Sequence, residues 1–409
     1  MSPRRLLIYS HDSFGLGHLS RCRSIALSLV ARNPKLSVMI ISGLPLIARF
    51  GFHPQIHVTL VPGIIKTDAG EYRALSIEHD IHEAIEQRSR IILETAESFQ
   101  PNLILVDKEP LGVRGEVQAA LEWAKQHGVP VVLGLRDVMD EPALLMREWA
   151  RKNAVAAIED YYDEIWVYGL PQIFDPLTGI ELSSSARSRI VYTSYLRRFD
   201  HDGGADTVLP HPIEPPFLLV TPGGGGDGER LVDWVLKAVE YDAEIPHRIL
   251  IVNGPFMNAE RRAGFETRAA RLPNVSMTDF VPGMERLMAT ASGIVAMGGY
   301  NTFCEILSFD KPALIVPRTT PRLEQFIRAS RAEELGLLSM LVDHVDRAPQ
   351  PMAQALRKLP WLKRPSSVLI PGLLAGHETI AKRAEFWLSR MVAGPLMAEA
   401  QAAAVRARE

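Results

Sequence analysis

Ser292-Gly-Ile-Val-Ala-Met-Gly-Gly-Tyr-Asn-Thr-Phe-Cys-Glu305 is the stretch that decides the fold. Its apolar run, Ile294 to Met297, is short and bounded by glycines, which is typical of a parallel strand buried on both faces. Gly298 and Gly299 allow a sharp turn and a close approach to a ligand, because neither carries a Cβ. The residues that follow are predicted to form a helix whose free N–H groups and positive dipole end suit a phosphate.

Asn301 and Glu305 are four residues apart, so they share one face of this predicted helix. A carboxylate one turn above the glycine turn can accept hydrogen bonds from both hydroxyls of a ribose. The working hypothesis is a nucleotide site, with a pyrophosphate at Gly298 and Gly299 and the ribose on Glu305. The alternative is an ordinary strand–helix–strand unit in which Glu305 is a solvated helix residue.

Length and composition restrict the class of protein. A chain of 409 residues is too long for one core and favours two or three domains. The net charge of -3 gives no sign of a nucleic-acid partner. Cys22 and Cys304 are the two cysteines, and their separation implies neither a disulfide framework nor a cysteine zinc site. The sequence shows neither a signal peptide nor a run of 18 apolar residues, so we expect a cytoplasmic protein.

Strands and helices are predicted to alternate through two halves of the chain. The first half predicts strands at 6–10, 38–42, 58–60, 103–106, 131–135 and 165–168, and helices at 19–32, 77–99 and 115–127. The second half predicts strands at 217–220, 249–252, 275–278 and 294–297, and a helix at 229–239. The alternation predicts an α/β fold of two Rossmann-like domains with parallel sheets that face each other across a cleft.

The domain boundaries follow from composition. Residues 1–200 form the predicted N-terminal domain, and residues 201–216, rich in Asp, Gly, His and Pro, the linker. Residues 217–375 form the C-terminal domain. The helix at 376–392 is expected to pack back toward the first domain, and 393–409 is an alanine- and charge-rich tail.

Polar residues follow several predicted strands. Gly15-Leu-Gly17-His18 lacks the third glycine of a dinucleotide fingerprint and ends with an imidazole at a helix start. Asp107-Lys108-Glu109, Arg136-Asp137 and Tyr168 also follow strands, where open parallel sheets bind ligands. For each of them, a loop salt bridge or a helix cap is the commoner role.

With these motifs the chain resembles the MurG-like group of nucleotide-sugar glycosyltransferases, which have the GT-B fold. The resemblance covers most of the chain. In the second half it rests on Thr278-Asp-Phe-Val-Pro-Gly-Met284, Leu287-Met288, Gly298-Gly299, Thr302, Glu305, Lys311-Pro312, Val316-Pro317 and Glu324-Gln325. A subfamily of predicted bacterial glycosyltransferases is similar in Tyr9 to His18, Val106 to Pro110, Gly134 to Asp137 and Tyr162 to Gly169.

The resemblance implies an acceptor-binding first domain and a donor-binding second domain. It implies that the main chain near Phe280 and Val281 reads the base, that Glu305 holds the ribose and that Gln325 contacts the donor sugar. The donor-binding set is Gly15, Gly17, Gly223, Gly224, Phe280, Val281, Gly298, Gly299, Asn301, Thr302, Glu305, Glu324 and Gln325. For Gly223 and Gly224, a hinge loop is the alternative to a phosphate or acceptor-side turn.

The catalytic residues are expected in the first domain. His18 is the best base for an incoming hydroxyl, since an unperturbed imidazole titrates near a pKa of ~6.5. Its alternative is a helix-start residue that donates to a carbonyl or contacts a phosphate. Arg136 and Asp137 are further candidates, with Asp137 placed in the catalytic set. However, Gly15-x-Gly17-His18-x-x-Arg21-Cys22 resembles nucleotide-sugar hydrolases of this fold, in which that histidine activates water.

The resemblance also bears on stereochemistry. Common retaining GT-B enzymes have two glutamates eight positions apart, and the position eight after Glu305 is Ala313. This favours inversion by direct displacement. The second half has no clustered Asp-x-Asp motif that would hold a metal ion, so none is expected. The expected function is transfer from a UDP-linked sugar to a hydroxyl acceptor in polysaccharide or glycoconjugate synthesis, with no cofactor.

Other functions stay open. A nucleotide-sugar hydrolase or epimerase and a non-catalytic nucleotide-sugar sensor are the alternatives. The segment from Leu44 to Phe52, apolar with cations beside it, could contact a membrane peripherally, although a core helix is the commoner role of such a segment. The oligomeric state cannot be predicted from the sequence.

Overall fold

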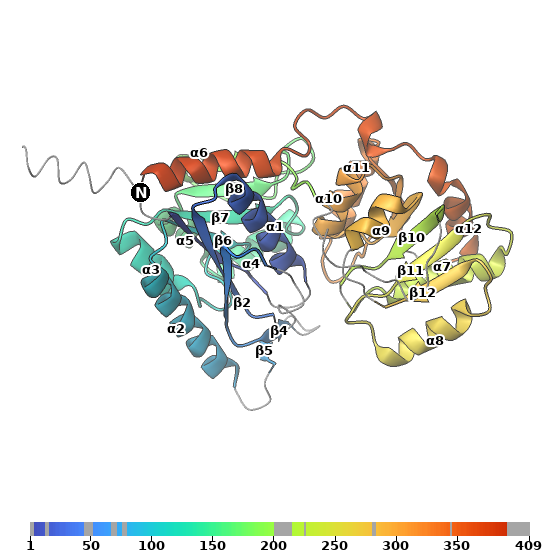
Figure 1. Cartoon of the computed structure of the whole chain (residues 1–409), viewed down its shortest axis with the longest axis horizontal. Coiled ribbons are helices and arrows are strands. Elements are labelled where there is room, and N and C mark those ends of the chain that lie inside the picture. Colours follow the sequence, from blue (N-terminus) through green and yellow to red (C-terminus); the bar gives the residue numbers. More distant parts are fainter. Residues whose placement is uncertain are drawn as a thin grey trace, which may run out of the picture.

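The computed structural model describes residues 4–12, 16–44, 52–66, 72–75, 80–199, 215–224, 226–279, 284–343 and 346–390. Two α/β halves lie side by side (Figure 1), and each contains a parallel sheet with helices against it. The predicted fold class is confirmed.

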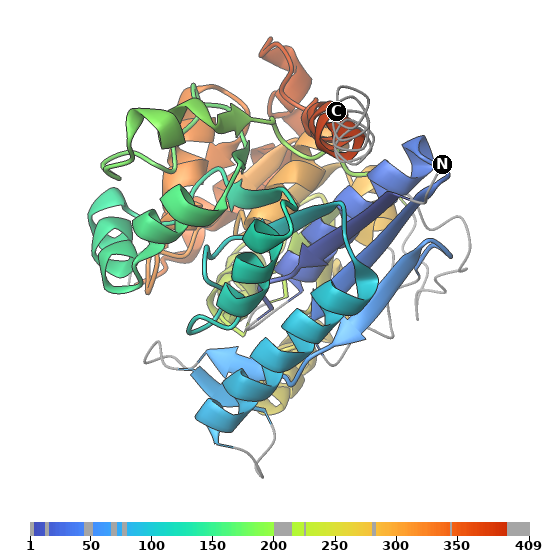
Figure 2. The same cartoon turned by 90° about the vertical axis from the view of Figure 1, so that its left-hand side faces the viewer.

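The first half, as far as it is described, forms a seven-stranded parallel sheet in the order β3-β2-β1-β6-β7-β8-β9. Its strands are β1 Arg4–Tyr9, β2 Leu36–Ser42, β3 Ile56–Leu60, β6 Leu103–Asp107, β7 Val131–Arg136, β8 Glu164–Tyr168 and β9 Ile190–Tyr192. The helices are α1 Gly17–Arg32, α2 Ile81–Phe99, α3 Gln118–Gln126, α4 Pro142–Arg151, α5 Ala154–Tyr161 and α6 Ser184–Ser188. A separate antiparallel pair joins β4 Ile64–Lys66 and β5 Tyr72–Ala74. Figure 2 shows α2 lying along the strands of the first sheet.

The described part of the second half forms a six-stranded parallel sheet in the order β12-β11-β10-β13-β14-β15. Its strands are β10 Phe217–Thr221, β11 Arg248–Val252, β12 Val275–Thr278, β13 Gly293–Ala296, β14 Ala313–Ile315 and β15 Ser339–Met340. The helices are α7 Glu229–Tyr241, α8 Ala259–Ala269, α9 Met284–Thr290, α10 Tyr300–Ser308, α11 Glu324–Glu334 and α12 Pro349–Lys358, followed by the 3₁₀ turns η2 Leu359–Trp361 and η3 Pro365–Ser367.

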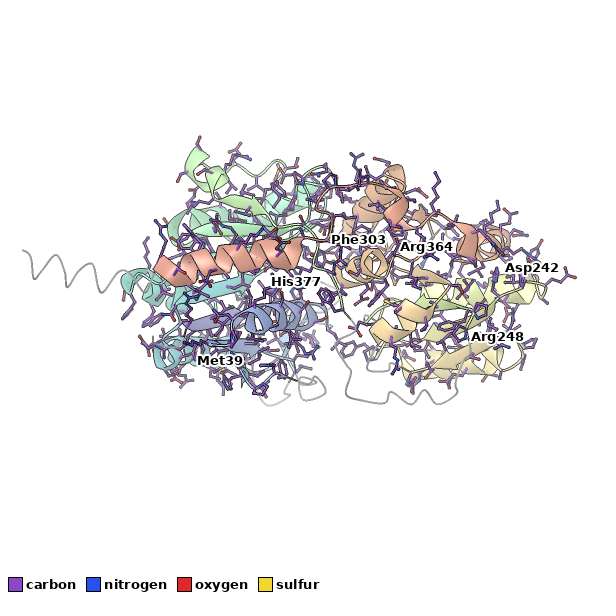
Figure 3. The ribbon with its side chains drawn as sticks, turned by 45° about the horizontal axis from the view of Figure 1, so that its top comes forward. Met39, Asp242, Arg248, Phe303, Arg364 and His377 are labelled. Carbon is purple, nitrogen blue, oxygen red and sulfur yellow. The ribbon has the colours of Figure 1, made fainter. Side chains whose placement is uncertain are left out.

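Central strands are buried along their whole length because helices cover both faces of each sheet. Every residue of β6, β8, β10 and β13 is buried. One apolar cluster runs from β1 and α1 through Tyr195 to Phe303 of α10 and on into the second sheet. The rings of Tyr195 and Phe303 lie 5.1 Å apart, edge to face. The halves therefore share a core at their junction, where Figure 3 shows Phe303.

The strand, glycine turn and helix of the deciding stretch are all present, as β13, Gly298-Gly299 and α10. Several details differ from the sequence-based expectation. Arg114 and Gly115 adopt positive φ angles of 51° and 89°, so α3 begins later than predicted. Glu324 begins helix α11, which was not predicted from the sequence. Helices α4 and α5 and strands β9 and β15 were not predicted.

A helix over 376–390 returns to the first half. Its Ile380, Ala384 and Leu388 are buried in the cluster that includes β1 and α1. Arg4 of β1 donates to Glu385 at 2.5 Å, and Arg383 pairs with Glu164 of β8. Figure 3 shows His377, at the start of this helix, near the junction of the halves.

Three sequence-based expectations fall largely outside the described residues. They concern most of the linker at 201–216, the tail at 393–409 and the segment Leu44 to Phe52, of which 45–51 are not described. Membrane contact by that segment stays a prediction. Across the helices that the structure describes, none has the length and apolar character needed to cross a membrane.

Candidate active site

His18 and Asp107 come together at the carboxyl end of the first sheet. His18 lies in the first turn of α1, which follows β1, and Asp107 is the last residue of the neighbouring strand β6. The His18 Nδ1 atom lies 2.5 Å from Asp107 Oδ2. An ionised carboxylate can only accept, so Nδ1 carries the proton and Nε2 presents a lone pair. This is the arrangement of an oriented general base.

Burial and charge set the protonation of this pair. Burial lowers the pKa of His18 to about 4, although Asp107 acts in the opposite direction. Burial by itself would raise the pKa of Asp107, but Arg21 and His18 together hold it well below its usual range. Arg21, one turn along α1, donates to Asp107 Oδ1 at 2.6 Å. At neutral pH the pair is a neutral imidazole beside a carboxylate.

A second imidazole, His11, lies beside the first, with its ring centroid 5.6 Å from that of His18. Tyr9 donates its hydroxyl hydrogen to Glu116, and Glu116 also pairs with Arg88. Toward His11 Nδ1, 3.4 Å away, the Tyr9 oxygen can therefore only accept. The Nε2 atom of His11 is then unprotonated and carries a lone pair. It is buried, and none of the described residues forms a hydrogen bond with it.

The glycine turn of the second half leaves open space at the start of α10. Gly298 has a φ of 77°, and a Cβ on it would lie 2.7 Å from Ile315 Cγ2, so only glycine fits. A Cβ on Gly299 would meet nothing within 4 Å. Helix α10 begins without a side-chain cap, whereas Asn258 caps α8. The first N–H groups of α10 are therefore not satisfied by a capping side chain.

Glu305 and Thr302 lie on the first turns of α10. Both are half-buried, and no hydrogen bond to either side chain occurs in the described ranges. Burial raises the pKa of Glu305 to about 7, opposed by Arg198. An unpaired, half-buried carboxylate is costly unless a ligand supplies donors. The Glu305 carboxylate can therefore accept hydrogen bonds from the two hydroxyls of a ribose.

The two halves meet where their glycine loops face each other. Asn301 donates to the Gly17 carbonyl at 3.0 Å and accepts from Arg198 at 2.6 Å, so its amide links the halves instead of facing an open space. A Cβ on Gly224 would lie 3.8 Å from the Leu16 nitrogen. Gly223, with a φ of 81°, has no neighbour within 4 Å of that position. Gly15, Phe280 and Val281 lie outside the described residues.

Asp137, the second residue of the expected catalytic set, is bonded within the protein. Its side chain has no exposed surface, and Arg328 donates to both of its carboxylate oxygens at 2.6 and 2.8 Å. The Tyr195 hydroxyl donates to it as well, at 2.9 Å. The acid that touches His18 is Asp107, whereas Asp137 lies in the junction of the halves, and a catalytic role for Asp137 stays a prediction.

Glu324 and Gln325 are also engaged within the protein. Glu324 accepts from Arg136 at 2.6 Å and from Arg318 at 3.0 Å. Burial would raise the pKa of Glu324, but Arg136 and two other arginines lower it to about 2. The Gln325 carbonyl oxygen accepts from the Arg318 main chain at 3.0 Å. A donor sugar could bind to Glu324 and Gln325 in two ways. It could use the remaining lone pairs and N–H groups of these side chains, or it could replace the hydrogen bonds described above.

Sequence reasoning named Asp107 only as a candidate by position and gave it no role, and it did not assign Arg21, His11 and Arg328 to the site. A signal existed for Asp107, because it ends an apolar run and so lies at the ligand-binding edge of a parallel sheet. The information that was absent was strand order. Only the pairing of β1 with β6 places Asp107, and not Asp137, beside the loop that carries His18. Grouped His, Cys, Asp or Glu side chains suited to a metal do not occur in the described ranges.

Comparison with known proteins identifies the second half. Residues 217–360 match the glycosyltransferase family 28 C-terminal domain. An uncharacterized glycosyltransferase of Methanosarcina acetivorans is 23% identical over 344 residues, which are 80% of this chain and 83% of that protein. The UDP-N-acetylglucosamine--N-acetylmuramyl-(pentapeptide) pyrophosphoryl-undecaprenol N-acetylglucosamine transferase of Histophilus somni is 22% identical over 295 residues, 61% of this chain and 80% of that protein.

The fold agrees with these matches. The crystal structure of MurG from Acinetobacter baumannii superposes with a TM-score of 0.51 and 14% identity, covering 93% of this chain and 95% of that one. The chain is a glycosyltransferase of the GT-B fold that resembles MurG, and its second half is a glycosyltransferase family 28 C-terminal domain. In this glycosyltransferase the glycine turn, α10 and Glu305 all fall inside the matched domain. The relatives named here are transferases, so they do not support the hydrolase alternative.

Proposed function

We propose that this glycosyltransferase moves a sugar from a UDP-linked donor to a hydroxyl acceptor, with inversion and without a metal ion. The observation that supports this most strongly is the contact of His18 Nδ1 with Asp107 Oδ2 at 2.5 Å. It leaves Nε2 as a neutral base at the ligand-binding edge of the first sheet. A UDP-linked donor is supported by the similarity to the UDP-N-acetylglucosamine transferase of Histophilus somni.

In the proposed reaction the acceptor hydroxyl gives its proton to His18 Nε2 as its oxygen attacks the anomeric carbon. The new carbon–oxygen bond forms while the bond to the diphosphate breaks, and its electron pair leaves with the nucleoside diphosphate. Asp107 stabilises the imidazolium that results, because its carboxylate holds Nδ1–H. Burial opposes the ionised form of Asp107, but its contacts with Arg21 and His18 keep it ionised throughout.

The second half would hold the donor. The diphosphate would lie at Gly299, where the main chain is open and the N–H groups at the start of α10 can donate to it. Glu305, one turn further along, would accept from the ribose hydroxyls. Direct displacement by an activated hydroxyl inverts the anomeric centre, and Ala313 occupies the position where common retaining enzymes have a second glutamate.

The test is incubation of the purified protein with UDP, dTDP and a panel of UDP-linked sugars, without acceptor. Calorimetry would measure binding, and nucleoside diphosphate release would measure hydrolysis. We expect UDP to bind and the cognate donor to raise the melting temperature while it is hydrolysed slowly. Rapid release that is lost in His18→Gln would show that water is the acceptor. His57→Gln, on the exposed face of β3, is the matched control.

Stereochemistry is tested separately, once an acceptor supports turnover. NMR of early product should show the anomeric configuration opposite to that of the donor. A retained configuration would overturn the direct displacement, and tighter binding of dTDP than of UDP would overturn the assignment of the base.

A further inference from the structure

Lys108 is a cation beside the His18–Asp107 pair, and the residues that the structure describes form no ion pair with it. It follows Asp107 directly and is half-buried. Within the described ranges its ammonium group forms neither a hydrogen bond nor an ion pair. Lysines are rarely buried without a partner, because an unpaired charge removed from water is costly.

The main chain holds Lys108 at this place under strain. The N–H of Glu109 donates to the Asp107 carbonyl at 2.9 Å, which closes a three-residue turn around Lys108. Lys108 has a φ of 72°, in the left-handed region, and turns of this kind are rare for residues other than glycine. Its own N–H donates to Gly134 of β7 at 2.7 Å, which fixes the turn at the sheet edge. Strain of this sort persists where the surroundings require it, commonly at ligand sites.

The acids around Lys108 are already paired. Glu109 accepts from Lys152 at 2.9 Å, and Glu324 accepts from Arg136 and Arg318. The remaining cation near Lys108, Arg322, is engaged with Asp140 and Glu148. Each of these acids therefore already has a cationic partner other than Lys108.

Arg136 provides a second buried N–H donor that has no acceptor among the described residues. It is the last residue of β7, and only 13% of its side chain is exposed. One of its terminal nitrogens bonds Glu324, but its Nε is buried and has no hydrogen-bond partner. The Lys108 N–H donates to the carbonyl of Gly134, two residues before Arg136 in β7, so the two cations come from adjacent strand ends.

Lys108 also lies close to both substrate positions. It follows Asp107, whose carboxylate contacts His18, and its N–H donates to Gly134 of β7. Two residues further along β7, Arg136 pairs with Glu324 of the second half. Lys108 therefore lies between the base and the residue expected beside the donor sugar. An anion bound at this place would be next to the bond that is made and broken.

We propose that Lys108 and Arg136 form an anion subsite that binds a carboxylate or phosphate substituent of one of the two reacting molecules, near the anomeric carbon. This rests on the proposed function, since it takes the position of the reacting bond from His18 and Glu324. The substituent belongs either to the donor sugar, as in a uronic acid, or to the acceptor. The subsite is distinct from Gly299 and the start of α10, where the nucleoside diphosphate would bind.

The experiment uses matched neutral and anionic probes with full-length wild type, Lys108→Met and Lys108→Arg. The donor arm compares UDP-glucuronate with UDP-glucose. The acceptor arm compares glucuronate and glucose 6-phosphate with glucose, in the presence of UDP. In one arm the anionic probe should bind roughly ten- to hundredfold more tightly than its neutral partner, as a charge-assisted hydrogen bond predicts.

Lys108→Met should bring that ratio close to one while UDP affinity stays unchanged, and Lys108→Arg should preserve most of the preference. Lys125→Met, an exposed lysine of α3, controls for the loss of one positive charge. The arm that responds identifies the molecule that carries the anion. Equal binding of the probes in both arms, or a preference that persists in Lys108→Met, would overturn the proposal. If UDP does not bind to the wild type, the proposed nucleotide site is refuted. The acceptor arm is then measured without UDP, so the anion subsite is still tested.

Discussion

Arg328 of the second half donates to both carboxylate oxygens of Asp137 in the first half, at 2.6 and 2.8 Å. The third nitrogen of the same guanidinium donates to the Gly298 carbonyl at 3.0 Å. One buried side chain thus joins the two halves and fixes the glycine turn that we assign to the donor. The position of that turn depends on the junction of the halves as well as on its own sequence.

Breaking this pair should destabilise the protein. Arg328→Met leaves the Asp137 carboxylate buried and unpaired, which should lower the free energy of unfolding by about 3–5 kcal/mol. The double variant Arg328→Met/Asp137→Leu should recover most of that loss, because no unpaired charge remains. Denaturant midpoints of the two variants and the wild type measure the effect. A double variant no more stable than Arg328→Met would contradict this account.

Asp107→Asn should reduce turnover and leave nucleotide binding intact. The amide cannot stabilise an imidazolium, so we expect a loss on the order of 10²- to 10⁴-fold in rate at saturating donor. Calorimetry with UDP should give an unchanged affinity, because Asp107 lies in the opposite half from the proposed donor site. His18→Gln should show a loss of similar size. If only the affinity changed, Asp107 would have a role in binding instead.

The rate at saturating donor should not change when the pH is lowered from 8 to 5. Burial lowers the pKa of His18 to about 4, so the imidazole stays neutral as the pH falls from 8 to 5 and gains its proton only below that range. The rate of donor breakdown should therefore be flat over that interval and fall near pH 4. A rate that halves near pH 6.5, the ordinary value for histidine, would show that His18 is exposed in the working enzyme.

Nucleotide affinity should depend on pH in a different range. Burial raises the pKa of Glu305 to about 7, and only the ionised carboxylate can accept from both ribose hydroxyls. UDP affinity should fall as the pH decreases from 8 to 6, by at most about tenfold per unit below the pKa. In Glu305→Gln the affinity should be weaker and independent of pH over this range. A wild-type affinity that does not change would remove Glu305 from the ribose site.

The two glycines of the turn should respond differently to alanine. Gly298→Ala adds a Cβ 2.7 Å from Ile315 at a φ of 77°, so we expect a loss of stability of about 1–3 kcal/mol. Gly299→Ala meets no atom within 4 Å, so its melting temperature should stay close to that of the wild type. Its new methyl group instead enters the space proposed for the diphosphate, and UDP should bind more weakly. An unchanged UDP affinity in Gly299→Ala would place the diphosphate elsewhere.

The sequence was most informative where local pattern and geometry coincide. The run from Ile294 to Glu305 predicted strand, turn and helix, and His18 was correctly expected at the start of a helix. The contact of His18 with Asp107 instead of Asp137 could not be predicted, because periodicity does not reveal strand order. The partners of Asp137 and Glu324 could not be predicted, because ion pairs between the halves join residues nearly 200 positions apart.

The return of the helix at 376–390 to the first half affects how the polypeptide can be made. Ile380, Ala384 and Leu388 complete an apolar surface begun by β1 and α1, which are among the first segments to leave the ribosome. That surface stays uncovered until nearly the whole chain has been synthesised. A nascent chain must therefore keep its first half from aggregating throughout translation, and a fragment ending near residue 200 would carry an exposed apolar face. The first half of this protein is translated before the second half, but its packing is completed only when the helix at 376–390 has been synthesised.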